Sequence, residues 1–307
     1  MTRFFRYFAG LALAAGLACG MGAAHAQEAA TLPSAAPAGQ AAATPEIRPP
    51  LIPASQFARR PAFWDTQLSP DGSMFAFMRH GESTKQFIIT DTVTGKLVRA
   101  LAADPKDELE WYRWVTNDKL LLSVSTPGYF FDEEVRYTRL VLVEVSSGVM
   151  TRLFERSDVV EGDNVIHVAK DGSHILVAIQ QTIYDYPSVM RHELKPKGKM
   201  TKVQDPRDGV WNWVTDDQGV VRMGTGWIEN RLKIYYRAGA AQELKLVARL
   251  KDDDSAESYF DALQILGGSD EGYVLSQGET GRVGLRRFNF ATREVIETVY
   301  EHPQWDI

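Results

Sequence analysis

The chain has almost no cysteine, no excess of basic residues and no apolar run long enough to span a membrane. Its one cysteine, Cys19, lies in a segment that we expect to be removed, which excludes disulfides, thiolate metal sites and cysteine catalysis in the mature protein. Lys and Arg total 34 against 40 Asp and Glu, for a net charge of −6. Nucleic acid is therefore not an expected partner, because phosphate backbones bind to basic surfaces.

The longest apolar stretch has the features of an export signal. It runs for about 14 residues, from Phe8 to Met21, whereas a helix that spans a bilayer needs roughly 20. Arg3 and Arg6 precede it, and Ala24-His25-Ala26 supplies a small-x-small cleavage pattern. We predict a signal peptide over residues 1–26 and no stable membrane span after its cleavage. The mature protein is then secreted across the inner membrane, with the periplasm as its expected location.

Residues 27–55 are rich in alanine and proline and poor in aromatic residues. Six of the 14 prolines in the chain fall here: Pro33, Pro37, Pro45, Pro49, Pro50 and Pro53. Such a segment buries too little apolar surface to offset the entropy lost on ordering. It is therefore predicted to be an extended or disordered linker, followed by one domain over residues 56–307.

That domain contains a repeat marked by polar turns that carry aspartate. The repeated aspartates are Asp71, Asp118, Asp171, Asp217 and Asp270, spaced 46 to 53 residues apart. Short runs of β-forming residues flank each turn, and two more strands joined by a tight turn complete each block. This spacing predicts an all-β fold, a β-propeller with about five recognisable four-stranded blades at approximately 56–103, 104–156, 157–204, 205–251 and 252–307. A β-sandwich or barrel also has short strands, but neither requires the same turn in every block.

The repeated residues have structural explanations. Asp in a tight turn accepts hydrogen bonds from backbone N–H groups, so the aspartates are not expected to ligate metal. Four tryptophans on the strands before these turns are expected in the blade cores: Trp111, Trp114, Trp211 and Trp213. His167 and His174 flank one turn and can face each other across it, but without a third ligand we expect no metal site. No cofactor is expected either.

Two stretches resemble a known family. Residues 57–64, which run into Leu68-Ser69-Pro70-Asp71-Gly72, and residues 111–121 are similar to the N-terminal β-propeller domain of bacterial prolyl oligopeptidase-family serine peptidases, in their dipeptidyl and acylaminoacyl peptidase branch. In that family an α/β-hydrolase domain follows the propeller and carries a Gly-x-Ser-x-Gly motif with later Asp and His partners. This chain has no such motif and no recognisable triad, so no catalytic residue is predicted.

The resemblance implies a non-catalytic, substrate-gating portion of a secreted peptidase. Such a portion acts on peptides only when it is joined to a hydrolase domain, in the same polypeptide or as a protein partner. Family members typically have seven or eight blades, so five blades suggest an incomplete propeller and a truncated sequence. A complete five-bladed propeller is the alternative on fold. On function, the alternative is an autonomous periplasmic β-propeller that serves as a protein-binding scaffold.

Candidate binding residues come from the loops between the second and third strands of two blades. They combine aromatic rings with carboxylates: Tyr129, Asp132, Glu133, Glu134, Tyr184 and Tyr186. Loops between blades emerge on the same face and add further acidic residues, so this face is expected to be negative and to attract a cationic or free-amine group. In the dipeptidyl peptidase branch a propeller Glu pair holds the substrate ammonium, and Glu133-Glu134 resembles that pair. The alternative is that the acidic loops serve only solubility.

Overall fold

The computed structural model describes residues 51–59, 61–81, 84–130, 132–154, 160–195, 198–251 and 259–307. The chain divides into two compact units, Met1–Ala58 and Arg59–Ile307. In the first unit the described residues include one short helix, α1 (Ala54–Phe57). The predicted signal peptide and the linker up to residue 50 lie outside the described residues.

The second unit consists of five four-stranded antiparallel sheets, which are the blades of the propeller. Blade 1 contains β1 (Phe63–Leu68), β2 (Met74–His80), β3 (Lys85–Asp91) and β4 (Leu97–Ala102). Blade 2 contains β5 (Glu108–Trp114), β6 (Lys119–Phe130), β7 (Glu133–Glu144) and β8 (Met150–Arg152). Blade 3 contains β9 (Val165–Val168), β10 (His174–Ile179), β11 (Ser188–Glu193) and β12 (Met200–Gln204). Blade 4 contains β13 (Asn212–Thr215), β14 (Val221–Ile228), β15 (Arg231–Tyr236) and β16 (Lys245–Lys251). Blade 5 contains β17 (Phe260–Ile265), β18 (Glu271–Gln277), β19 (Val283–Asn289) and β20 (Glu294–Tyr300).

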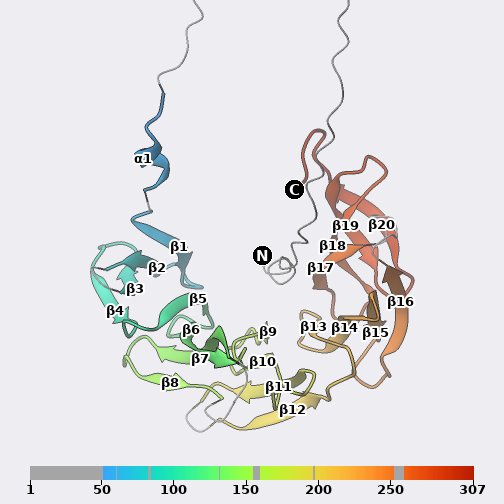
Figure 1. The fold of residues 1–307 in the computed structure, drawn as a ribbon, viewed down its shortest axis with the longest axis horizontal. Helices are drawn as coiled ribbons and strands as arrows, with labels where there is room; N and C mark the ends of the chain where they lie inside the picture. Colours follow the sequence, from blue (N-terminus) through green and yellow to red (C-terminus); the bar gives the residue numbers. More distant parts are fainter. Residues whose placement is uncertain are drawn as a thin grey trace, which may run out of the picture. The chain divides into compact units, whose positions relative to one another are not determined.

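Within each blade the strands pair in chain order as an up-and-down meander. The five sheets follow one another from β1 to β20 (Figure 1). The predicted all-β propeller of four-stranded blades is therefore confirmed.

The turns at Asp71 and Asp171 accept backbone hydrogen bonds as predicted, and the turns at Asp71 and Asp217 also join neighbouring blades. In the first turn the Asp71 carboxylate accepts hydrogen bonds from the backbone N–H and hydroxyl of Ser73, at 3.0 and 2.8 Å. These bonds hold the pKa of Asp71 below its usual value. Between blades, the backbone N–H of Asp71 donates to the side chain of Asn117 at 3.1 Å. Farther along the chain, the Asp217 carboxylate accepts the N–H of Gly267 at 2.7 Å.

Each blade packs an apolar face on the next blade. Between blades 1 and 2, for example, Phe87 lies against Tyr112 with ring centroids 4.6 Å apart, in a cluster that also includes Met78, Leu120 and Val143. Three further clusters fill the other contacts between successive blades. Because burial of a large apolar side chain contributes about 1.5–3 kcal/mol, these interfaces supply the main stabilisation.

The two end blades each carry an apolar face that no cluster of described residues covers. On blade 1, Phe63, Phe75 and Phe77 lie on the side away from blade 2, and the Phe77 ring centroid is 5.6 Å from each of the other two. Phe63 is 54% exposed. On blade 5, Leu285 and its strand partner Tyr300 lie on the face turned away from blade 4, and Tyr300 is 52% exposed. Such faces are normally covered in a folded protein.

Candidate functional site

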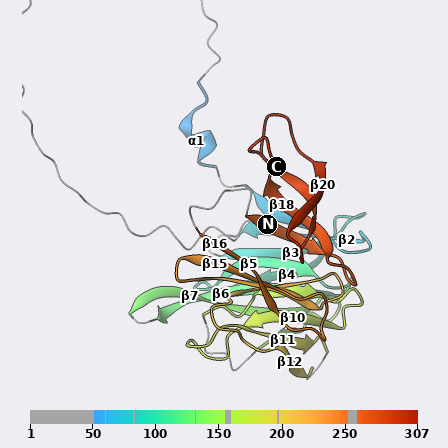
Figure 2. The ribbon, with the colours of Figure 1, turned by 90° about the vertical axis from the view of Figure 1, so that its right-hand side faces the viewer.

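The connections between strands place two sets of loops at one end of the blades. Because the strands of each blade alternate in direction, the loop between its second and third strands and the loop to the next blade emerge at the same end. The predicted binding residues belong to this end. Its most extended element is the hairpin formed by β6 and β7, which reaches out beyond the neighbouring strands (Figure 2).

Tyr137 fixes the outer part of this hairpin. Its ring lies across Gly128, where an added Cβ would be 2.5 Å from a ring carbon, and its hydroxyl donates to the carbonyl of Tyr129 at 2.6 Å. Only glycine leaves room for the ring at this position. The Arg139 guanidinium lies 5.5 Å from the centroid of the same ring. The hairpin is thus held by specific side-chain contacts as well as by its strand pairing.

Charged residues at the base of the hairpin neutralise one another. The Arg136 guanidinium donates to the Ser125 hydroxyl at 2.8 Å, and that hydroxyl donates to the Glu110 carboxylate. Lys85 from blade 1 contacts Glu108 at 2.8 Å and lowers the pKa of that carboxyl, chiefly through this hydrogen bond. Part of the acidity that the sequence suggests for this face is therefore balanced by basic side chains.

The two glutamates of the predicted pair, Glu133 and Glu134, lie on opposite faces of the hairpin. In the hairpin register Tyr129 is opposite Glu134 and Phe130 is opposite Glu133. Side chains of successive strand residues point to opposite faces, so Tyr129 and Glu134 share one face while Glu133 lies on the other. Within the described part of the chain, neither glutamate has an ion-pair partner. One face thus presents an exposed aromatic ring beside a free carboxylate.

Asp132 occupies the tip of the hairpin in the left-handed region, with φ of 66°. Asp adopts this conformation more readily than most residues. It is exposed, and the neighbouring position 131 lies outside the described residues. Asp132 therefore shapes the turn, and its carboxylate faces solvent.

The predicted tyrosines of blade 3 lie on the ordered loop between β10 and β11. Asp185 braces this loop by accepting the N–H and hydroxyl of Thr182 at 3.0 and 2.8 Å. Tyr184 is 82% exposed, whereas the Tyr186 ring packs edge-on against Trp211 of blade 4 with centroids 5.1 Å apart. Among the described residues, no hydrogen bond or ring contact joins this loop to the β6–β7 hairpin.

Trp211 is the residue that the sequence reasoning placed wrongly. Trp114 and Trp213 are buried as expected, and Trp111 donates its indole N–H to Asp163 at 2.7 Å. Trp211 instead is 47% exposed, because it lies in the segment before β13 and not within the strand. The sequence carried no signal for this, because the start of β13 at Asn212 is known only from the structure. Trp211 thus joins Tyr184 and Tyr186 in one group of aromatic side chains. We call these three residues the blade 3–4 aromatic surface.

The described residues do not form a recognisable catalytic or metal centre. His167 and His174 do face each other, with ring centroids 6.2 Å apart, and burial lowers the pKa of both. Among the described residues, no group of three or more His, Cys, Asp or Glu side chains is arranged to hold a metal ion. The site therefore offers binding groups, namely exposed rings and free carboxylates.

No known family model matches the sequence, and no curated protein does either. Solved structures match its fold. A prolyl endopeptidase structure is similar with a TM-score of 0.51 and 12% identity, over 76% of this chain and 35% of that chain. The acylaminoacyl peptidase of Pyrococcus horikoshii gives 0.48 and 18%, over 80% of this chain and 39% of that one. The β-propeller domain of the trilobed protease from Pyrococcus furiosus gives 0.46 and 15%, over 79% and 68%.

The likeness to the prolyl endopeptidase structure, at a TM-score of 0.51, supports the propeller fold. The chain spans about two fifths of the acylaminoacyl peptidase and about a third of the prolyl endopeptidase. In the part of the chain that the structure describes, no helix has the length and apolar character needed to cross a membrane.

Proposed function

We propose that this chain is the non-catalytic, substrate-gating propeller portion of a secreted prolyl oligopeptidase-like serine peptidase. It acts on peptides together with a hydrolase domain, which is either part of the same polypeptide or a separate partner. The signal-like segment over residues 1–26 supports export, with the periplasm as the proposed location.

The observation that carries this proposal is the pair of apolar faces that no described residue covers, on a propeller whose described residues form no catalytic triad. The phenylalanines of blade 1 and the leucine and tyrosine of blade 5 expose surface that a soluble protein normally buries against another structural unit. Further blades, or a partner that packs on the propeller, would remove this surface from water. A protein that works only as part of a larger unit is expected to have such faces.

The proposed contact with substrate lies on the hairpin face that carries Tyr129 and Glu134. A free carboxylate next to an exposed aromatic ring suits an ammonium group, since the carboxylate supplies the charge and the ring supplies a cation–π contact. The N-terminal amine of a peptide is the cation that this surface would bind in a peptidase. Glu133, on the opposite face of the hairpin, has no part in the contact.

This division of labour is directly testable. Binding of a fluorescent tripeptide with a free N-terminus should weaken several-fold in Glu134→Gln and in Tyr129→Ala, because each change removes one partner of the ammonium. Glu133→Gln is the matched control and should bind like the wild type. Acetylation of the peptide should abolish the difference between the variants. Equal effects of the two glutamine substitutions would contradict the proposed contact.

The second candidate function is an autonomous protein-binding scaffold. The blade 3–4 aromatic surface favours it, because exposed rings on a braced loop are typical of binding hot spots. It requires a propeller that is stable alone. The two functions therefore differ in whether a hydrolase accompanies the chain in its native cell.

A further inference from the structure

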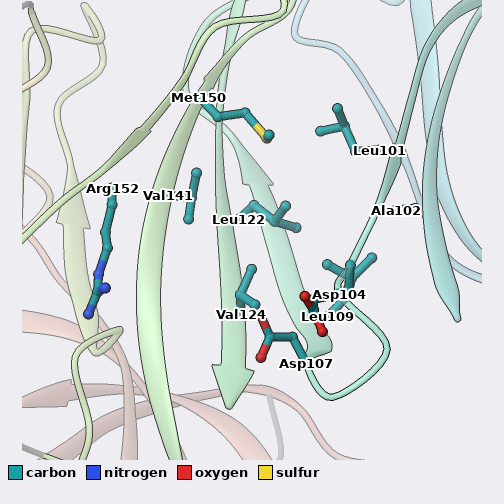
Figure 3. Close-up of a pocket in the computed structure, with 11 residues that line it drawn as sticks. Leu101, Ala102, Asp104, Asp107, Leu109, Leu122, Val124, Val141, Met150 and Arg152 are labelled. Carbon is teal, nitrogen blue, oxygen red and sulfur yellow. The ribbon is translucent and has the colours of Figure 1, made fainter.

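A cavity of about 290 Å³ lies between blades 1 and 2, near their outer strands. Its walls come from β4 and the loop that follows it, and from all four strands of blade 2 (Figure 3). This volume is just below the range found for small-molecule sites, which is roughly 300–1,000 Å³. None of the predicted binding residues lines it.

The outer strand of blade 2, which borders the cavity, is short. β8 has 3 residues, whereas β4, β16 and β20 have 6, 7 and 7. A short outer strand leaves the crevice between the two blades open, and apolar side chains of Leu122 and Val141 face it. Met150, on β8, lines the same space and is 56% exposed. The apolar part of a bound ligand would displace water from the apolar side chains that line the cavity.

The polar groups of the cavity carry both signs of charge. Asp104 and Asp107 lie on one turn, in which the N–H of Asp107 donates to the carbonyl of Asp104 at 2.8 Å. The Thr126 hydroxyl donates to one oxygen of Asp107 at 2.7 Å and fixes that carboxylate. Arg152 lies at the end of β8 and is exposed. Within the described residues, none of these three charged groups has an ion-pair partner.

The three charged groups lie toward one end of the cavity, where Leu109 and Val124 also lie, and the end opposite them is apolar. Figure 3 shows the Asp107 carboxylate below Val124, the Asp104 carboxylate beside Leu109, the Arg152 guanidinium on the opposite side of the view, and Leu101 and Met150 at the far end. A ligand that fits this arrangement has an aliphatic part and a head with both a cation and an anion. A simple cation leaves Arg152 unmatched, and a fatty acid leaves the two carboxylates unmatched.

We propose that this cavity binds a small aliphatic zwitterion, either a free α-amino acid such as leucine or a dipeptide such as dileucine. The ammonium lies at the carboxylates of Asp104 and Asp107, the ligand carboxylate pairs with Arg152, and the aliphatic side chain packs on Leu122, Val141 and Met150. The site is separate from the Tyr129–Glu134 contact, and the inference does not depend on the proposed peptidase function. Occupancy would join blade 1 to blade 2 through the ligand and stabilise their interface.

Calorimetric titration of the full chain with leucine and with dileucine tests the proposal. At least one of them should bind with a dissociation constant below about 1 mM, and N-acetyl-leucinamide, which has the same side chain but no charges, should bind at least about tenfold more weakly. Whichever of leucine and dileucine binds more tightly shows whether the site prefers a free amino acid or a dipeptide. Absence of binding by both up to about 10 mM, or equal binding of the uncharged compound, would overturn the proposal.

Two variants locate the binding in this cavity. Arg152→Gln should weaken binding at least about tenfold, because it removes the partner of the ligand carboxylate. Arg249→Gln, at an exposed arginine on the outer strand of blade 4, is the matched control and should bind like the wild type. Equal affinity of the two variants would overturn the proposal.

A measurement on the wild-type protein tests the site without relying on variants, which can fold poorly. With ¹³C-methyl-labelled methionine, the Met150 signal should shift on addition of the charged ligand, while the signal of Met223, which is buried in blade 4, should not. The Met150 signal is assigned by its loss in Met150→Leu. A Met150 signal that stays in place at saturating ligand would overturn the proposed site.

Discussion

Arg222 is a fully buried arginine that holds two blades together. Its guanidinium contacts Asp216 at 3.1 Å, the Tyr236 hydroxyl at 2.6 Å and, in blade 5, the carbonyl of Ser269 at 2.7 Å. Arg222 and Asp216 are 1% and 2% exposed at their side chains. This network was not predictable from the sequence, because Arg222 lies 47 residues from Ser269 and the two meet only when the blades pack.

Replacing Arg222 by Met should destabilise the protein strongly. The substitution keeps a similar volume but leaves the buried Asp216 carboxylate without its cation, a loss worth about 3–5 kcal/mol. Urea unfolding followed by tryptophan fluorescence measures the change in the free energy of unfolding. Arg249→Met, at an exposed position, should change it by less than about 0.5 kcal/mol. A loss in the Arg222 variant as small as in this control would contradict the structural role.

The histidines of blade 3 should make stability depend on pH. Burial lowers the pKa of His167 from its ordinary value of 6.5, and the neighbouring His174 and Arg113 act in the same direction, against Asp216 and Asp217. The unfolded chain therefore binds a proton more readily than the folded chain. Stability from this group is fully present above pH 6.5 and is lost as the pH falls below that value.

The expected result is a lower free energy of unfolding at pH 5.5 than at pH 7.5, by less than about 1.4 kcal/mol per pH unit for one group. His167→Gln should show a smaller loss of stability over the same interval, because it removes one of the titrating groups. Some loss should remain, because His174 and His192, whose pKa values are also lowered by burial, still titrate. Urea unfolding at the two pH values measures both. An undiminished loss in the variant would show that His167 is not responsible.

At the scale of the element, the β6–β7 hairpin shows what a sequence predicts and what it leaves open. The aromatic and acidic residues of the loop were identifiable, and strand alternation explains why Glu133 and Glu134 separate to opposite faces once the register is known. The register itself was not predictable, because it depends on how far the strands extend beyond the blade. The exposure of Trp211 likewise follows from where β13 begins, at Asn212.

Gly128→Ala should loosen the hairpin without unfolding the blade. The added methyl group would lie 2.5 Å from the Tyr137 ring, so the ring must move and its hydroxyl must leave the Tyr129 carbonyl. Amide hydrogen exchange should become faster over residues 126–130 and 133–137, while the midpoint of global unfolding changes little. Gly239→Ala is the control, because no atom lies within 4 Å of its added Cβ. Unchanged exchange in the Gly128 variant would contradict the role given to Tyr137.

At the scale of the whole molecule, the repeated aspartate turns were enough to predict the blades. Each turn recurs because a hairpin at that point needs Asp and often Gly, as at Gly72 and Gly172 with φ of 74° and 67°. The contacts between blades were not predictable, since they combine residues from different repeats. The uncovered faces of blades 1 and 5 became visible only when the partners of every other blade face were known.

The most direct test of the account is to isolate the protein from its native host and ask whether a serine hydrolase accompanies it. An antibody against the propeller, a fluorophosphonate probe for reactive serines and an intact-mass measurement are sufficient. The account predicts a probe-labelled hydrolase, in the same polypeptide or as a stoichiometric partner, and hydrolysis of a chromogenic dipeptide substrate that a serine-directed inhibitor blocks. A stable monomer of this chain alone, with no labelled protein and no hydrolysis, would contradict it and favour the scaffold.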